Sequence, residues 1–172
     1  GGAGDGPAND RDACGEAYFL MGAADLPDTI NLAAGMPAGS MIVWGAHGIE
    51  NLGEPGGDEF GEDISIADIN GDGLQDAVIG AFRADGFDNN TYWAGAAYLF
   101  YGQYDYPEAV DLAAGIPDSV SAFYGEGVDR LMGDTTPLGD VNGDGYFDIL
   151  FGCVHGGGPY RIFKSGALAV MR

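Results

Sequence analysis

The sequence predicts an all-β protein whose strands form four-stranded antiparallel blades, making an incomplete β-propeller of about two and one-third blades. Glycine content, short strand-like runs and a long internal repeat lead to this prediction. The 172 residues include 32 glycines without a Gly-X-Y period, which indicates many tight turns between short strands rather than collagen. Apolar residues make up 46% of the chain and aromatic residues 12%, enough for a folded core.

The repeat covers most of the chain. The segment AADLPDTINLAAGMP at 23–37 returns as QYDYPEAVDLAAGIP at 103–117, an offset of 80 residues without a gap. With the same offset, GEAYFLMG at 15–22 returns as GAAYLFYG at 95–102. GALAVMR at 166–172 is a looser match to the same segment. A fixed period of this kind is typical of arrays and propellers, in which one supersecondary unit recurs.

Each repeat contains several short runs that read as strands. These runs are rich in β-branched or aromatic residues and are bounded by Gly, Asp and Pro; in the best-defined repeat they are Met41–Trp44, Ile64–Ala67, Asp76–Ala81 and Ala96–Tyr101. LAAG at 32–35 and 112–115 has the length of one helical turn, too short for a helical solenoid. Four strands per repeat suit a propeller blade, where radial repetition protects strand edges.

The repeat divides the chain into three parts. Residues 1–22 read as the C-terminal strand or strands of a preceding blade, 23–102 as one blade and 103–172 as another. A closed propeller needs at least four blades, so we expect either an excerpt of a longer protein or sheets completed by other chains. A closed trimer and an open filament, in which the N-terminal strand joins a neighbour's edge, both satisfy this requirement.

Charge narrows the class of partner. Acidic residues outnumber basic ones 27 to 6, giving a formal net charge of −21, which repels nucleic acids and anionic membrane surfaces. Cations are the natural ligands of such a surface, although a secreted or salt-adapted protein also carries a solvated acidic face. The chain has neither a membrane-length apolar run nor a signal-peptide pattern, so we expect no membrane insertion. If the protein is secreted, this sequence is its processed form or an excerpt.

A nine-residue acidic motif, Asp-x-Asn-Gly-Asp-Gly-x-x-Asp, occurs at 68–76 and again at 140–148. Positions 1, 3, 5 and 9 offer side-chain oxygens and position 7 a backbone carbonyl, an all-oxygen set that favours Ca²⁺ over Mg²⁺. The sequence therefore predicts two calcium sites, with ligands Asp68, Asn70, Asp72, the Leu74 carbonyl and Asp76 in the first, and Asp140, Asn142, Asp144, the Tyr146 carbonyl and Asp148 in the second.

Other classes of acidic loop fit less well. An EF-hand requires a bidentate Glu at loop position 12, where Ile79 and Phe151 stand. A dockerin-like pair would continue into helices, whereas strand-like DAVIG and DILFG follow here. A metal-free acidic turn that only caps a strand would leave three carboxylates repelling one another.

These motifs together resemble the FG-GAP repeat of integrin α chains and of many bacterial and archaeal secreted proteins. The resemblance rests on FG at 60–61, the acidic loop, GAF at 80–82 and GAAYLF at 95–100, and it spans nearly the whole chain. In the second copy MG at 132–133 and GCV at 152–154 depart from the pattern. The resemblance implies an extracellular propeller in which calcium rigidifies the loop between the first two strands of a blade, while other loops bind adhesive ligands.

Weaker features leave alternatives open. Asn89 begins an N-N-T glycosylation sequon, a pattern that also arises by chance. Cys14 and Cys153 align with positions that face each other across one hairpin, yet they lie in different blades. They form a blade-to-blade or intermolecular disulfide, or each is a buried small residue. No nucleophile motif surrounds His47 or His155, so we expect no enzyme.

We therefore expect a non-catalytic, extracellular, calcium-binding structural or adhesion protein. It either self-assembles into a filament or oligomer, or forms part of a larger cell-surface propeller, with a cell-surface protein or glycan as its ligand. The alternative is a carbohydrate-binding or targeting module of a secreted enzyme.

Overall fold

The computed structural model describes residues 6–8, 10–49, 56–125, 138–153 and 167–171. For Leu138, Cys153 and 167–171 only the backbone is described. Within these ranges no helix is long and apolar enough to cross a membrane.

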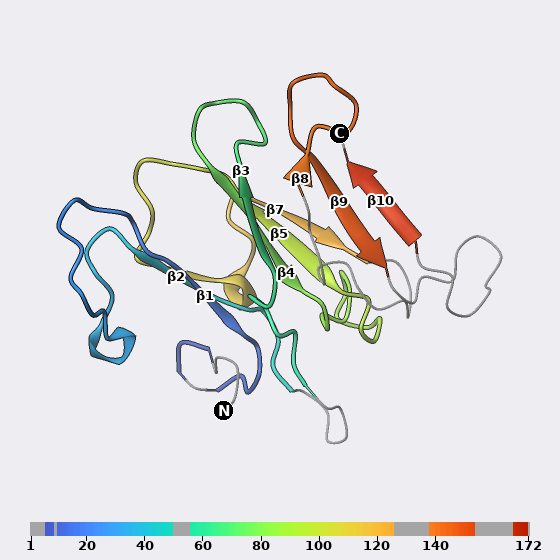
Figure 1. The fold of residues 1–172 in the computed structure, drawn as a ribbon. Helices are drawn as coiled ribbons and strands as arrows, with labels where there is room; N and C mark the ends of the chain where they lie inside the picture. The colour runs from blue at the N-terminus through green and yellow to red at the C-terminus, as the bar shows by residue number, and fades with distance from the viewer. Residues whose placement is uncertain (1–5, 9, 50–55, 126–137, 154–166, 172) are drawn as a thin grey trace.

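The fold is all-β, as predicted, and its strands form three sheets that lie side by side (Figure 1). The strand orders are β1-β2-β6, β3-β4-β5-β7 and β10-β9-β8. The elements are β1 Glu16–Phe19, η1 Leu32–Ala34, β2 Met41–Trp44, β3 Ile64–Ala67, β4 Asp76–Ala81, β5 Ala96–Phe100, β6 Ala109–Asp111, η2 Leu112–Ala114, β7 Val120–Tyr124, β8 Leu138–Gly139, β9 Asp148–Cys153 and β10 Ala167–Met171, where η denotes a single 3-10 turn.

The four-stranded sheet is antiparallel throughout and is covered on both faces. All residues of β4 and β5 are buried, and alternate residues face opposite sides because the side-chain period of a strand is two. Ile79 and Tyr98 join a core shared with β1 and β2, whereas Val78 and Leu99 join a second core with β9. Each core therefore lies between two neighbouring sheets, the packing expected of successive propeller blades.

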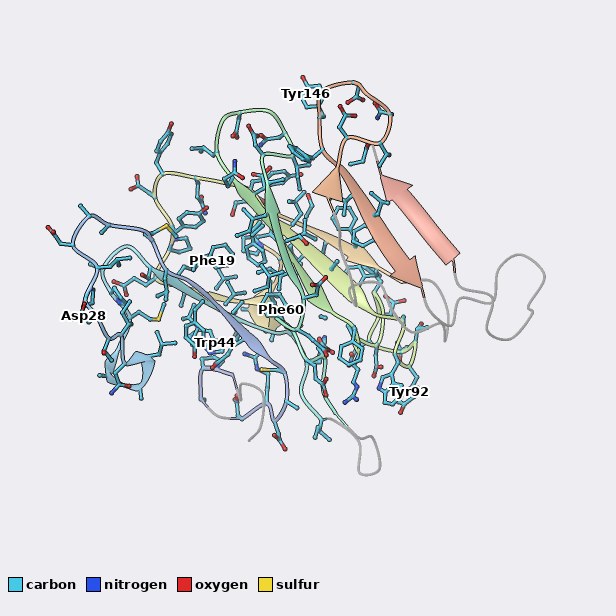
Figure 2. All side chains as sticks on the ribbon, in the orientation of Figure 1. Phe19, Asp28, Trp44, Phe60, Tyr92 and Tyr146 are labelled. Atoms are coloured by element: carbon cyan, nitrogen blue, oxygen red, sulfur yellow. The ribbon has the colours of Figure 1, made fainter. Side chains whose placement is uncertain are left out.

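Aromatic rings occupy the first of these cores. Phe60, 2% exposed, lies 5.6 Å from the Tyr98 ring and 6.3 Å from the Phe100 ring between centroids. Phe19 of β1 reaches the same Phe100 ring at 5.5 Å (Figure 2). The FG pair at 60–61 also bonds to the GA pair at 80–81, since Gly61 N–H donates to Gly80 O at 2.9 Å.

The sequence repeat and the sheets are offset by one strand. β2 pairs with β1 of the preceding segment, and the fourth strand of the central sheet is β7, which belongs to the next repeat. A short parallel strand, β6, lies along the outer edge of β2. The four expected strands of the repeat are confirmed, but they are shared between two sheets. The blade boundaries at 22/23 and 102/103 stay a prediction.

Candidate metal centre

The two acidic loops lie next to each other at one end of the sheets. One joins β3 to β4 and the other joins β8 to β9 (Figure 1). Tyr146 stands on the second loop (Figure 2) and is 56% exposed. A methyl group added to Gly71 of the first loop would lie 2.8 Å from Tyr146 Cε1, so the loops touch.

Asp68 organises the start of the first loop. Its Oδ1 accepts the N–H groups of Gly71 at 2.8 Å and Asp72 at 3.0 Å, and its Oδ2 accepts the Gly73 N–H at 2.9 Å. Gly71 and Gly73 have φ values of 75° and 88°, a left-handed conformation that glycine adopts without steric cost. The chain therefore folds back around one carboxylate.

The middle positions of the loop continue this pattern. Asn70 Oδ1 accepts the Asp72 N–H at 2.9 Å, and Asp72 Oδ1 accepts the Leu74 N–H at 2.8 Å. Asn70 Nδ2 also donates to Asp72 Oδ2 at 2.9 Å. These turns, in which a short polar side chain bonds to the backbone two residues on, are typical of Asx motifs. They bring the oxygens of positions 1, 3 and 5 to the exposed side of the loop.

Asp76, at position 9, differs from the other carboxylates because it is fully buried. Its Oδ2 accepts the Ile69 N–H at 2.9 Å, and its Oδ1 accepts the Gly102 N–H at 2.7 Å. A buried carboxylate is stable only when it is well supplied with donors. Asp76 therefore ties the acidic loop to the turn after β5.

The second loop repeats most of the side-chain-to-backbone bonds of the first, but its Asn142 Nδ2 donates to Asp148 Oδ1 at 3.3 Å where Asn70 Nδ2 donates to Asp72. Asp140 accepts the N–H groups of Gly143 at 2.6 Å, Asp144 at 3.2 Å and Gly145 at 2.9 Å. Asn142 and Asp144 repeat the two Asx bonds at 2.8 and 3.0 Å. Asp148, 3% exposed, accepts the Val141 N–H at 2.8 Å, as Asp76 accepts Ile69.

The backbone donors also set the electrostatics of this loop. The N–H groups of Gly145, Gly143 and Asp144 lower the pKa of Asp140, which accepts their bonds while solvent-exposed. Hydrogen bonds to the ionised form favour that form. Asp140 therefore stays ionised, as a cation ligand must be.

Among the described residues, no three side chains of His, Cys, Asp and Glu converge as a metal cluster. In the loops, Asp68 and Asp140 accept backbone N–H groups of their own loop, whereas Asp76 also accepts the Gly102 N–H from outside its loop. The donor set still fits a hard cation, since it contains only carboxylate, amide and carbonyl oxygens. A carboxylate has about four lone-pair sites, and Asp72 uses only two of its own in the bonds described.

The remaining predicted site residues lie elsewhere. Asn89 is half-buried with φ 51° in the loop before β5, and its glycosylation stays a prediction. Cys14 is a buried thiol whose Sγ lies 3.4 Å from Gly15 O. The side chain of Cys153 and all of His155 fall outside the described residues, so the disulfide also stays a prediction. His47 N–H donates to the buried Asp58 Oδ2 at 3.1 Å.

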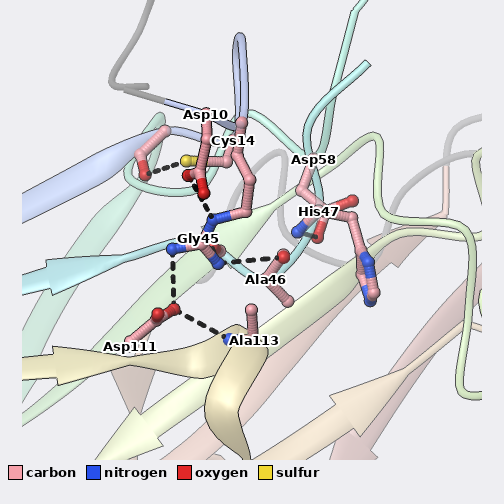
Figure 3. A network of polar contacts seen from close by, with 10 residues as sticks. Asp10, Cys14, Gly45, Ala46, His47, Asp58, Asp111 and Ala113 are labelled. Carbon is pink, nitrogen blue, oxygen red and sulfur yellow. Dashed lines mark hydrogen bonds and ion pairs between the residues drawn. The ribbon is translucent and has the colours of Figure 1, made fainter. Parts of the chain in front are cut away.

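One structural contact was missed at the level of sequence. Arg11 donates from Nη1 to Gly45 O at 2.9 Å and Ala46 O at 3.1 Å, and its Nη2 lies 2.7 Å from Asp111 Oδ1 (Figure 3). The Nη2 contact has the distance of an ion pair without the direction of a hydrogen bond. The sequence offered one hint of this contact: Arg11 is one of only six basic residues in a chain with 27 acidic ones.

Comparison with known proteins finds similarity to FG-GAP repeats and to integrin alpha chains. Residues 60–100 match the family model described as FG-GAP repeat. The chain is 32% identical over 142 residues to integrin alpha-PS2 of Drosophila melanogaster, covering 74% of this chain and 10% of that protein. It is 30% identical over 141 residues to integrin alpha-IIb of Mus musculus, covering 76% of this chain and 13% of that protein. The chain thus spans only a small part of these relatives.

Proposed function

Because the chain belongs to the FG-GAP repeat family, we propose that it is a non-catalytic, extracellular module whose two acidic loops each bind one Ca²⁺. The observation that carries this proposal is the backbone frame that both loops share. In each loop the carboxylate at position 1 accepts three backbone N–H groups. The carboxylate at position 9 is buried.

The proposed ligands follow from this frame. Calcium takes about six to eight oxygens, and positions 1, 3, 5, 7 and 9 supply the protein's share. In the first loop these are Asp68, Asn70, Asp72, the Leu74 carbonyl and Asp76; in the second they are Asp140, Asn142, Asp144, the Tyr146 carbonyl and Asp148. A bound Ca²⁺ supplies positive charge that offsets the repulsion among these carboxylates.

Calcium binding at this position would stiffen the blade. Asp76 is the first residue of β4 and also holds Gly102 after β5. Ordering the loop around an ion therefore restrains both central strands of the sheet. Because binding to the folded state alone stabilises it by mass action, calcium is expected to act as a structural element of the fold.

The biological role we propose is adhesion or scaffolding. Its support is the similarity to integrin alpha chains, of which this chain covers a small share. In this proposal residues 1–22 end one blade, and 23–102 and 103–172 supply the next two. Further blades of the same protein, or other copies of the chain, complete the sheets.

Calorimetric titration of Ca²⁺ into chelator-stripped protein tests the calcium proposal. We expect two equivalents per chain, with dissociation constants in the range of about 10⁻⁴ to 10⁻³ M that is typical of extracellular modules. Asp68→Asn and Asp140→Asn should each remove one equivalent, and the double variant both. Asp105→Asn, which changes an exposed carboxylate outside the loops, is the matched control and should leave two. Unchanged stoichiometry in the double variant would contradict the proposal.

A further inference from the structure

Tyr146 takes part in both acidic loops. It occupies position 7 of the second loop, where its carbonyl is a proposed ligand and its N–H donates to Asp144 Oδ1 at 3.0 Å. Its ring lies against Gly71 of the first loop, since a methyl group added to Gly71 would be 2.8 Å from Cε1 and 3.4 Å from Cδ1 of that ring. The backbone of Tyr146 therefore belongs to one loop, whereas its side chain packs on the other.

The ring contacts the part of the first loop that spaces its ligands. Gly71 lies between Asn70 and Asp72, two proposed ligands. Its N–H is one of the three that Asp68 accepts, at 2.8 Å, and its φ of 75° belongs to the turn around that carboxylate. A side chain at this position would occupy the place of the ring. The Tyr146 ring therefore limits how far this turn can move.

A second connection between the loops is buried. Ile69, at position 2 of the first loop, packs against the core that the central sheet shares with β9, and its N–H donates to Asp76 Oδ2 at 2.9 Å. Ile149, 4% exposed, belongs to the same core and directly follows Asp148, position 9 of the second loop. The two loops therefore share a buried core as well as the exposed ring contact.

Charge alone would make the two loops compete for cations. Each loop carries three carboxylates, so a divalent cation in one loop makes the potential at the other less negative and weakens binding there. At physiological salt this effect is screened over about 8 Å, whereas contacts between packed groups are not screened. Packing and charge therefore predict opposite signs for the coupling between the loops.

We propose that the two acidic loops bind calcium cooperatively, with the Tyr146 ring carrying part of the coupling. This inference rests on the proposed calcium binding and adds its regulation. An ordered second loop holds the Tyr146 ring against Gly71, so the first loop has less conformational entropy to lose when it is ordered in turn. Linkage makes the effect reciprocal, because the first loop then favours the second by the same factor.

Calorimetric titration of Ca²⁺ at about 0.15 M salt measures this coupling. The coupling factor is the product of the two wild-type association constants divided by the product of the single constants of Asp68→Asn and Asp140→Asn. Independent sites give a factor of one. We expect a factor of about five or more, at the lower end of typical couplings between sites.

Variants of Tyr146 isolate the contribution of the ring, because they leave every charge and the proposed carbonyl ligand in place. Tyr146→Ala should lower the coupling factor by about threefold or more, the loss expected for one contact between residues. Tyr146→Phe keeps the ring and should keep the factor. Phe147→Ala removes the neighbouring aromatic ring, 43% exposed, and is the matched control that should also keep it.

Hydrogen exchange provides a readout that does not depend on fitted constants. In Asp68→Asn only the second loop is expected to bind Ca²⁺, yet calcium should still add protection at 68–76. Adding Tyr146→Ala to this variant should reduce that protection, whereas adding Phe147→Ala should not.

Two outcomes would overturn the coupling and leave the calcium sites in place. One is a wild type that binds two equivalents with a coupling factor of one or below. The other is a factor that Tyr146→Ala does not change, although the variant melts cooperatively and still binds two equivalents. A wild type that binds no calcium would instead overturn the proposed function, and this inference with it.

Discussion

Gly45 and Gly125 occupy equivalent places at which two backbones almost touch. A methyl group on Gly45 would lie 2.0 Å from Cys14 O, and one on Gly125 would lie 1.9 Å from Ala94 O. Each glycine also donates its N–H across the same gap, at 2.9 Å to Gly15 O and 2.8 Å to Gly95 O. The close approach holds each strand pair at its end, so no side chain is tolerated there.

Gly125→Ala should therefore destabilise the protein by about 2 kcal/mol or more, because the backbones must separate to admit the methyl group. Urea unfolding followed by circular dichroism measures this difference. Gly22→Ala is the control, since nothing lies within 4 Å of a methyl group there. Equal free energies of unfolding for the two variants would show that the close approach of the two backbones does not constrain residue 125.

The Cys14 thiol should react slowly with thiol reagents in the folded protein. Burial raises the pKa of the Cys14 thiol, and the nearby Arg11 guanidinium offsets part of this rise. At about pH 8, close to the ordinary cysteine value, we expect Ellman's reagent to modify Cys14 at least about a hundredfold more slowly in buffer than in urea. Two titratable thiols in urea without reductant would support separate cysteines, whereas none would show that the cysteines form disulfides, within the chain or between chains.

At the residue scale, sequence alone identified the acidic-loop residues, since their spacing is local and repeated. It did not show that Asp76 reaches Gly102 or that Arg11 reaches Asp111, because these contacts join residues 26 and 100 positions apart. Such contacts depend on how sheets pack, which no local pattern encodes.

At the scale of elements, β4 is the strand on which the packing of the sheets depends. Ile79, 1% exposed, faces the core shared with β1 and β2, and Val78, fully buried, faces the core shared with β9. Consecutive residues of β4 therefore pack against the two sheets on either side of the central sheet. Ile66 of neighbouring β3 is 64% exposed and takes no part in either core.

Ile79→Ala should cost about 2–4 kcal/mol, because it leaves a cavity between two sheets. The same substitution at Ile66 should change the free energy of unfolding by no more than about 0.5 kcal/mol. Chemical denaturation of both variants in calcium-containing buffer gives the comparison. Similar losses at the two positions would mean that β4 does not lie at the centre of the fold.

The strands themselves were largely predictable from the repeat. The expected runs at 41–44, 64–67 and 76–81 match β2, β3 and β4 in their bounds, and LAAG forms a 3-10 turn in both copies. Partner choice was not predictable, since β2 could not be assigned to β1 and β6 by period alone. β6 is only three residues long, so alternation of polar and apolar residues could not identify it. It is a strand because it pairs with the edge of β2.

At the scale of the whole molecule, charge and metal are coupled. A net charge of −21 produces self-repulsion that opposes compaction, and the two acidic loops lie in contact through Gly71 and Tyr146. Divalent cations at this end of the sheets would relieve the repulsion among the carboxylates of the two loops. The sequence predicted the loops and their number, whereas their proximity follows only from the packing of successive sheets.

Hydrogen exchange followed by mass spectrometry, in calcium and in chelator, tests whether the two acidic loops bind calcium and stiffen the strands that follow them. Calcium should add protection at 68–76 and 140–148 that extends into β4 and β9, whose first residues are the buried Asp76 and Asp148. The Asp68→Asn/Asp140→Asn double variant should lose this added protection at both loops. Exchange that is identical in calcium and chelator, or protection that arises away from both loops, would contradict it.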